Sequence, residues 1–150
     1  KRVKGGRKVI KGQISMNTHS NRIMLFDGKF TTGYRVVEFR IIPKSPQNQE
    51  EVIAVLSTEA QGGVPSTLNF SNNTQIAFSL WNTPNQTESS TWDLVVSDNM
   101  AVEDLFLSNY TTGDDTDLNF YIELEKYEFT AWDGAGTMVA NQSQSVSGAP

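Results

Sequence analysis

The side chains of this sequence that could act as catalysts are few and scattered. The single histidine, His19, lies in the stretch SMNTHSN beside Ser15, Thr18 and Ser20, which are candidate nucleophiles if a base is held against one of them. No G-x-S-x-G elbow accompanies this stretch, and serine is common throughout the chain. Because a catalytic site needs a fixed constellation of groups, we expect His19 to be a polar loop residue.

The composition excludes several kinds of site. The chain has no cysteine and one histidine, which excludes disulfides, thiolate zinc sites, cysteine nucleophiles and sites built from several histidines. A pair of carboxylates is a further candidate, because Glu123 and Glu125 fall on one face of an expected strand, with Glu128 close behind. Solvent-facing glutamates on a half-buried strand give the same pattern. We therefore expect a protein that is not an enzyme and has no cofactor.

One acidic stretch resembles a metal-binding loop in part. GDDTDLN places acidic and amide side chains at alternate positions, as at the opening of an EF-hand loop. The match then fails, because Phe120 stands where the EF-hand needs glycine and Lys126 where it needs glutamate. Two interpretations stay open: an acidic solvated turn, or a loose calcium site formed by Asp114, Asp115 and Asp117.

The tryptophans are candidates for a different kind of contact. Trp81, Trp92 and Trp132 stand next to asparagine or aspartate, and aromatic rings beside polar side chains are the ingredients of a carbohydrate-binding platform. A tryptophan in a strand also packs readily into the core. The sequence leaves both interpretations open.

The highest density of charge lies at the start of the sequence, in KRVKGGRKVIKG, residues 1–12. Six cationic side chains are candidates for binding nucleic acid or a protein partner: Lys1, Arg2, Lys4, Arg7, Lys8 and Lys11. Glycines interrupt the segment and disfavour a helix, so we expect an extended arm. Such an arm can lie along phosphates or on the acidic surface of a neighbouring copy. It has no aromatic residue, which argues against base recognition.

The rest of the chain has the opposite charge. Residues 1–12 hold six of the twelve bases and none of the seventeen acids, although the net charge of the whole chain is -5. After Lys44 the only base is Lys126. The acidic body should repel phosphate backbones and anionic membranes. We therefore expect contact with a polyanion only at the basic segment or around Arg35, Arg40 and Lys44.

Strands are the elements that must position these groups. The stretches VVEFRII, TQIAFSLW and LNFYIELEKY are rich in β-branched and aromatic residues, and turn-forming stretches such as NTPNQTESS separate them. The pair Asp27-Gly28, between RIMLF and KFTTGYRVV, predicts a β-hairpin. No apolar run approaches the roughly 18 residues of a membrane span, and none follows the basic start as in a signal peptide. We expect a soluble protein without a membrane partner.

About eight strands, polar connections and no long amphipathic helix predict an all-β fold. The expected architecture is an antiparallel β-sandwich of jelly-roll type with an extended basic N-terminal arm. A length of 150 residues suits one domain. We expect the arm over residues 1–15, the β-sandwich over 16–133 and a C-terminal tail over 134–150.

The arm, the acidic all-β body and the lack of a catalytic cluster together resemble viral shell proteins of the jelly-roll kind. The stretches GQISMNTHSNRIMLFDGKFTTGYRVVEFRIIP, MAVEDLFLSNYTT and YIELEKYEFTAWDGAGTMVANQSQ are similar to uncharacterised small proteins of marine phages, over most of residues 12–144. This resemblance carries no assigned activity and no catalytic residues. It implies a viral origin and nothing finer.

The expected function is that of a non-enzymatic virion structural protein, either a capsid subunit or a capsid cement or decoration protein. Such a protein would assemble through its β-sandwich and its arm. Its partners would be copies of itself and other virion proteins, with packaged nucleic acid as a second contact of the arm. The alternative is a carbohydrate- or receptor-binding module of a tail fibre or surface protein. A nucleic-acid-binding protein ranks third because the body is acidic.

Overall fold

The computed structural model describes residues 3–25, 28, 31–46, 50–85, 88–96 and 104–128. Within these residues the chain forms eight strands and no helix, which confirms the all-β prediction. In chain order the strands are β1 (Val3–Ser15), β2 (Asn21–Ile23), β3 (Thr32–Pro43), β4 (Glu50–Ser57), β5 (Gln75–Asn85), β6 (Glu88–Val95), β7 (Leu105–Thr111) and β8 (Asp117–Glu128).

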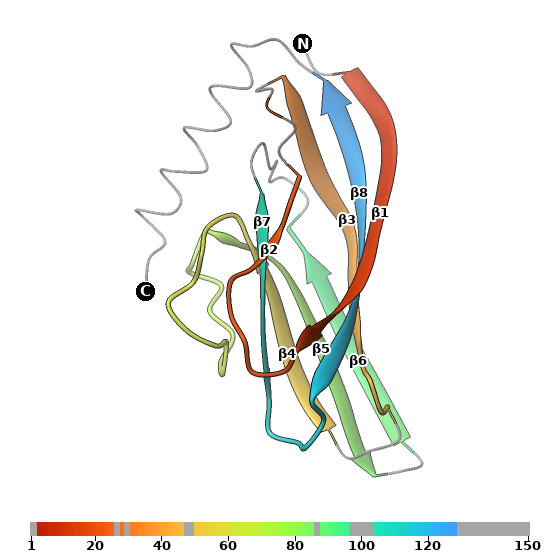
Figure 1. Cartoon of the computed structure of the whole chain (residues 1–150), viewed down its shortest axis with the longest axis vertical. Coiled ribbons are helices and arrows are strands. Elements are labelled where there is room, and N and C mark those ends of the chain that lie inside the picture. Colours follow the sequence, from red (N-terminus) through yellow and green to blue (C-terminus); the bar gives the residue numbers. More distant parts are fainter. Residues whose placement is uncertain are drawn as a thin grey trace.

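The strands form two antiparallel sheets (Figure 1), one with the order β1-β8-β3 and one with the order β2-β7-β4-β5-β6. A jelly roll is a long antiparallel hairpin that pairs its first strand with its last, the second with the seventh, the third with the sixth and the fourth with the fifth. Three of these pairs are hydrogen-bonded here, namely β1 with β8, β2 with β7 and β4 with β5. β3 and β6 touch, but β6 takes its hydrogen bonds from β5. The sandwich is therefore jelly-roll-like, as predicted, with one of the four pairs left open.

The core lies between the two sheets and takes alternate residues from each strand. β8 shows the alternation most clearly, since its residues are buried and half-buried in turn from Asp117 to Leu124. Phe39 of β3 has no exposed surface. The residues that fill the core include Val36, Phe39, Ile41, Ala54, Leu56, Ala77, Leu105, Leu107, Leu118, Ile122 and Leu124. This period of two is what holds the two sheets face to face.

The basic segment, over residues 3–15, is the edge strand of the three-stranded sheet. β1 pairs with β8 along its whole length, from Val3 opposite Glu128 to Ser15 opposite Asp117. At Gly12 it passes close over a core ring, because a Cβ there would lie 3.0 Å from Cζ of Phe120. The segment is extended, and within the described residues it is a strand of the sandwich. The predicted tail, 134–150, lies outside the described residues.

The hairpin predicted around Asp27-Gly28 is wrong. β2 pairs with β7 in one sheet, whereas β3 pairs with β8 in the other, so the connection between them passes from sheet to sheet. Gly28 has a φ of 87°, a value that favours glycine both in a hairpin turn and in a connection between sheets. Asp27 itself lies outside the described residues. The Asp-Gly signal located a turn but did not identify which strands pair.

A second crossing between the sheets, at residues 16–20, is fixed by reciprocal asparagine contacts. The backbone N–H of Asn17 donates to Oδ1 of Asn109 at 2.8 Å, and the N–H of Thr111 donates to Oδ1 of Asn17 at 2.9 Å. Asn109 is fully buried, and its amide nitrogen also donates to the carbonyl of Ser15 at 3.0 Å. These contacts tie the end of β1 to β7 and so join the two sheets.

Candidate functional site

The structure describes half of the cationic side chains that were predicted to bind a partner. Arg7, Lys8 and Lys11 lie on β1, where side chains alternate between the two faces of the sheet. Lys8 lies over the ring of the buried Tyr34, with its Nζ 5.8 Å from the ring centroid. Lys1, Arg2 and the side chain of Lys4 lie outside the described residues.

Arg7 is engaged by an acid of its own chain. Its guanidinium forms a hydrogen-bonded ion pair with the carboxylate of Glu123 on β8. The pKa of Arg7 is raised above its ordinary value, first by this hydrogen bond and then by the coulombic attraction of the same carboxylate. The side chain of Arg7 is still 53% exposed, so the pair is accessible to solvent and to salt. An acidic side chain of the same protein therefore takes the position that a phosphate would need.

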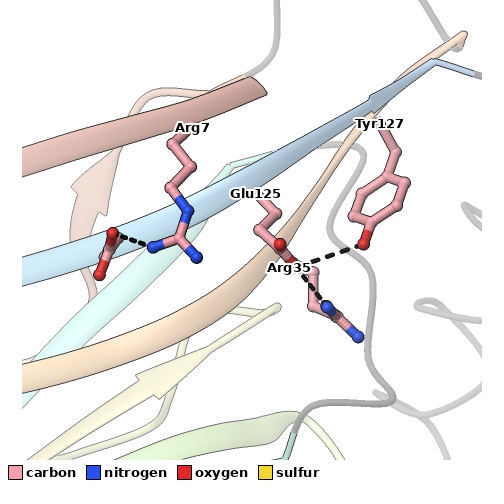
Figure 2. Close-up of polar contacts among 5 residues, drawn as sticks. Arg7, Arg35, Glu125 and Tyr127 are labelled. Carbon is pink, nitrogen blue, oxygen red and sulfur yellow. Dashed lines mark hydrogen bonds and ion pairs between the residues drawn. The ribbon is translucent and has the colours of Figure 1, made fainter. Parts of the chain in front are cut away.

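The same pattern continues across the outer face of the three-stranded sheet. Figure 2 shows Arg35 of β3 against the carboxylate of Glu125, with its Nε 3.1 Å from Oε1. The hydroxyl of Tyr127 donates to the same oxygen at 3.2 Å. Glu125 is only 5% exposed, so its charge is desolvated and depends on these partners.

We call this surface the ion-pair face. An acidic central strand, β8, lies between two strands that carry basic residues, β1 and β3. Its ion pairs are Arg7–Glu123, Arg35–Glu125, Arg40–Glu38 and Lys44–Asp117. Opposite charges on neighbouring strands stabilise the sheet and leave little excess of either sign. The ion-pair face is therefore poorly suited to binding a polyanion.

The candidate catalytic groups have structural contacts. His19 is exposed, with Nδ1 3.3 Å from Oγ of Ser20. That hydroxyl is held by Gln61, because it donates to the Gln61 carbonyl at 3.0 Å and accepts from the Gln61 N–H at 2.7 Å. Glu123 and Glu125 are both occupied by arginines of the ion-pair face. These residues do not combine into a nucleophile and base.

The acidic side chains around the start of β8 accept hydrogen bonds from nearby residues of the same chain. Asp115 accepts a hydrogen bond from the backbone N–H of Ser45 at 2.7 Å, and Asp117 accepts one from the hydroxyl of Thr116 at 3.1 Å. In the described part of the chain, no three acidic or histidine side chains are grouped so that they could hold a metal ion. The interpretation as a calcium site of Asp114, Asp115 and Asp117 gains no support, and the carboxylates of Asp115 and Asp117 serve as turn and strand-end acceptors.

The two described tryptophans lie on opposite faces of the five-stranded sheet. Trp92 of β6 stands opposite Leu80 of β5, and Trp81 is the next residue along β5. Since successive side chains alternate between faces, Trp81 points inward, where it packs against the core. Trp92 points outward and is 45% exposed. They do not form one shared platform, and Trp132 lies outside the described residues.

The outer face of the five-stranded sheet is apolar along a row that crosses four strands. Tyr110 of β7 stands opposite Ile53 of β4, Ile53 opposite Leu80 of β5, and Leu80 opposite Trp92 of β6. We call these four residues the apolar row. A hollow of about 310 Å³ lies over it, lined in part by Ile53, Leu80 and Tyr110. The row is thus only partly covered by its own chain.

A second row on the same face is covered. Phe78, 1% exposed, lies under Phe70 of the β4–β5 connection, with an edge-on contact and ring centroids 4.9 Å apart. Phe70 also stacks on Trp92, with centroids 6.5 Å apart, and is itself 58% exposed. Leu94 stands opposite Phe78 on β6 and is exposed. The apolar row together with Phe70, Phe78 and Leu94 is called the apolar face below.

A cleft of about 370 Å³ opens beside the contact between β3 and β6. Strands of both sheets contribute to its lining, which includes Trp81, Arg40, Asp93, Asn119 and Lys11. From the sequence, Arg40 was a candidate only for polyanions, Asn119 only for a metal-binding loop, and Asp93 only as the aspartate beside Trp92. The sequence signal for the cleft was Asp93. It is a carboxylate on an alternating strand, at a position where the alternation places the side chain on the inward face.

Comparison of the chain with protein-family models, with curated proteins and with solved structures finds no match. The described residues include no helix that could span a membrane. The functional evidence therefore lies in the surfaces of the sandwich itself.

Proposed function

We propose that the protein is a non-enzymatic structural protein of a virus particle, a capsid subunit or a protein that cements or decorates a capsid. The jelly-roll-like strand order and the resemblance to small proteins of marine phages support this class of function. Fold alone does not fix function, because the same sandwich serves many purposes. The proposal therefore depends on the surfaces that the sandwich presents.

The observation that carries the proposal is the apolar face. Antiparallel sheets that meet water on one side normally present polar residues there. Here the outer side of the five-stranded sheet presents Ile53, Leu80 and Trp92 in one row, next to the exposed ring of Phe70. Exposed apolar patches are typical of surfaces that contact a protein, a membrane or a ligand. We assign the contact of this face to neighbouring copies of the protein and to other proteins of the shell.

The size of the apolar contacts suits assembly in many copies. Removing the still exposed halves of Phe70 and Trp92 from water is worth on the order of 1 kcal/mol for each ring. One such contact binds two free subunits only weakly because of the loss of translational freedom, so association should appear only at high protein concentration. A closed shell repeats the contact in every subunit, so that weak contacts become collectively stable.

The basic strand has a secondary role in this account. Arg7 is neutralised by Glu123 of the same chain, and Lys8 lies against the ring of Tyr34. Contact with packaged nucleic acid would therefore involve fewer than six cations. We propose that β1 mainly stabilises the subunit and that protein copies in the virion are the principal partners.

Sedimentation velocity over a range of concentrations tests the proposal. The wild-type protein should sediment faster as its concentration rises, and Trp92→Glu should abolish this increase because it places a charge in the apolar face. Val9→Glu is the matched control, since Val9 is similarly exposed, at 52%, but lies on β1. A wild-type protein that stays monomeric at every concentration, and that is missing from purified particles, would contradict the proposal.

A further inference from the structure

The cleft beside β3 and β6 is a consequence of the open jelly-roll pair. In a fully paired jelly roll, β3 and β6 would share hydrogen bonds and close this corner of the sandwich. Here β6 bonds to β5, and Arg40 of β3 reaches Asp93 of β6 only through an ion pair of 3.7 Å. The corner therefore holds a cleft of about 370 Å³, within the size range of small-molecule sites.

The lining combines aromatic surface with hydrogen-bonding groups. Trp81 and Tyr121 contribute aromatic residues to the lining, and Asp93, Asn119 and Arg40 contribute residues with acceptors and donors, while the ring of Phe120 packs in the core. Oδ1 of Asn119 already accepts a hydrogen bond from Gln13 at 3.0 Å, which leaves its amide nitrogen as a donor. A flat apolar surface beside a few fixed polar groups is the usual composition of a specific ligand site.

The charges at the cleft are balanced. Arg40 is 2.6 Å from Oε1 of Glu38 and 3.7 Å from Oδ2 of Asp93. Asp93 also accepts a hydrogen bond from Ser79. With Lys11 included, two cations face two anions, so neither a polyanion nor a strongly cationic ligand gains a net attraction. Paired charges of this kind offer both donors and acceptors, which a ligand rich in hydroxyl groups can use at the same time.

Trp81 adds an unsatisfied donor to the same corner. Its indole Nε1 is buried and has no hydrogen-bond partner within the part of the chain that the structure describes. A buried donor without a partner costs about 1–3 kcal/mol.

We infer that this cleft binds a neutral saccharide, with one sugar ring against Trp81 and with hydroxyl groups bonded to Asp93, Arg40 and Asn119. Sugar rings present an apolar face of C–H groups and an equatorial rim of hydroxyls, which matches an aromatic side chain flanked by paired charges. The site differs from the platform considered from the sequence, because it uses one inward-facing tryptophan. It goes beyond the assembly function and uses a different surface, so either can fail without the other.

Saturation-transfer NMR on the full chain tests the inference, with methyl glycosides of glucose, galactose, mannose, N-acetylglucosamine, fucose and rhamnose as probes. We expect at least one probe to bind the wild-type protein in the millimolar range or tighter. Asp93→Asn should weaken that binding at least tenfold, since the carboxylate acceptor is lost. Asp114→Asn is the matched control, because Asp114 is an exposed acid outside the cleft lining, and it should bind the probe as the wild type does.

Fluorescence gives a second readout. In Trp92→Phe, which removes the exposed indole of the apolar face, the bound probe should still change the emission. Asn119→Ala serves as an independent cleft variant if Asp93→Asn unfolds, as judged by its melting curve. The inference is overturned if no probe binds at 10 mM, or if binding is unchanged in both cleft variants.

Discussion

The two sheets of the sandwich have outer faces of opposite character. The ion-pair face of the three-stranded sheet is built from matched charges, with Glu125 buried between Arg35 and Tyr127. The apolar face of the five-stranded sheet is built from rings and aliphatic side chains, of which Trp92 and Phe70 remain about half exposed. Most charges of the first face are paired within the subunit, although Val9 and Ile42 are exposed beside them, whereas the second face exposes two large aromatic rings. Assembly is therefore expected through one side of the sandwich only.

The comparison also bears on the basic segment, which pairs with β8 as an edge strand over residues 3–15. A basic strand beside an acidic strand gains cross-strand ion pairs, and each pair removes charge that would otherwise attract a polyanion. Within the described residues, one cation of the basic segment, Arg7, is paired with an acid of β8, Glu123. Charge asymmetry along a chain can thus be reduced when the chain folds.

The largest expected effect on stability comes from removing the ring of Phe78, the buried part of the apolar face. Phe78→Ala should lower the free energy of unfolding by about 3–5 kcal/mol, because it empties a fully buried ring position beneath Phe70. Chemical denaturation measures this change. Ile42→Ala is the control, since Ile42 lies on β3 and is 40% exposed, and its effect should be much smaller. Similar losses in the two variants would contradict the assignment of Phe78 to a packed layer.

On the ion-pair face, Glu125→Gln should lower the free energy of unfolding by about 1–3 kcal/mol, since it removes the buried negative charge that pairs with Arg35 and leaves only a neutral amide oxygen as acceptor. Glu123→Gln, two residues away on β8, removes the partner of the exposed Arg7 and should have a smaller effect. Denaturation in low salt and in 1 M salt separates the two, because salt should reduce only the Glu123 effect. Equal and equally salt-sensitive losses would show that Glu125 is not buried.

The packing of β1 on the sandwich predicts a difference in stability between two glycine substitutions. Gly12→Val should destabilise the protein by about 1–3 kcal/mol, because the added side chain meets the ring of Phe120. Gly62→Val is the control, since a Cβ at Gly62 has no atom within 4 Å. Thermal unfolding of the two variants gives the comparison. A harmless Gly12→Val would mean that residues 3–15 do not pack on the sandwich.

The smallest expected effect concerns Arg7 itself. Arg7→Ala should cause a slight drop in melting temperature at low ionic strength and none in 1 M salt, because the Arg7–Glu123 pair is exposed to solvent. The change in melting temperature caused by Lys8→Ala should depend less on salt than that caused by Arg7→Ala, since Lys8 also packs against the ring of Tyr34. Differential scanning calorimetry at two salt concentrations measures both. A large, salt-independent effect of Arg7→Ala would contradict the exposed character of the ion-pair face.

Much of the fold was predictable from the sequence, because alternation along TQIAFSLW and LNFYIELEKY follows directly from one buried face per strand. Strand partners were not, as the failed hairpin at Asp27-Gly28 shows, since pairing depends on contacts far apart in the chain. The candidate site was harder still. Asp93 and Trp81 lie on the paired strands β5 and β6, but they line one cleft with Arg40 only because these strands lie beside the edge strand β3, and the apolar row combines residues of four strands.

Hydrogen–deuterium exchange of the full chain at low and high concentration is the most direct test of assembly through the apolar face. The account predicts that, at high concentration, exchange slows in β6 and in the β4–β5 connection around Phe70, while the amides of β1 are unchanged. Protection that does not depend on concentration, or that appears in β1 and not in β6, would contradict it.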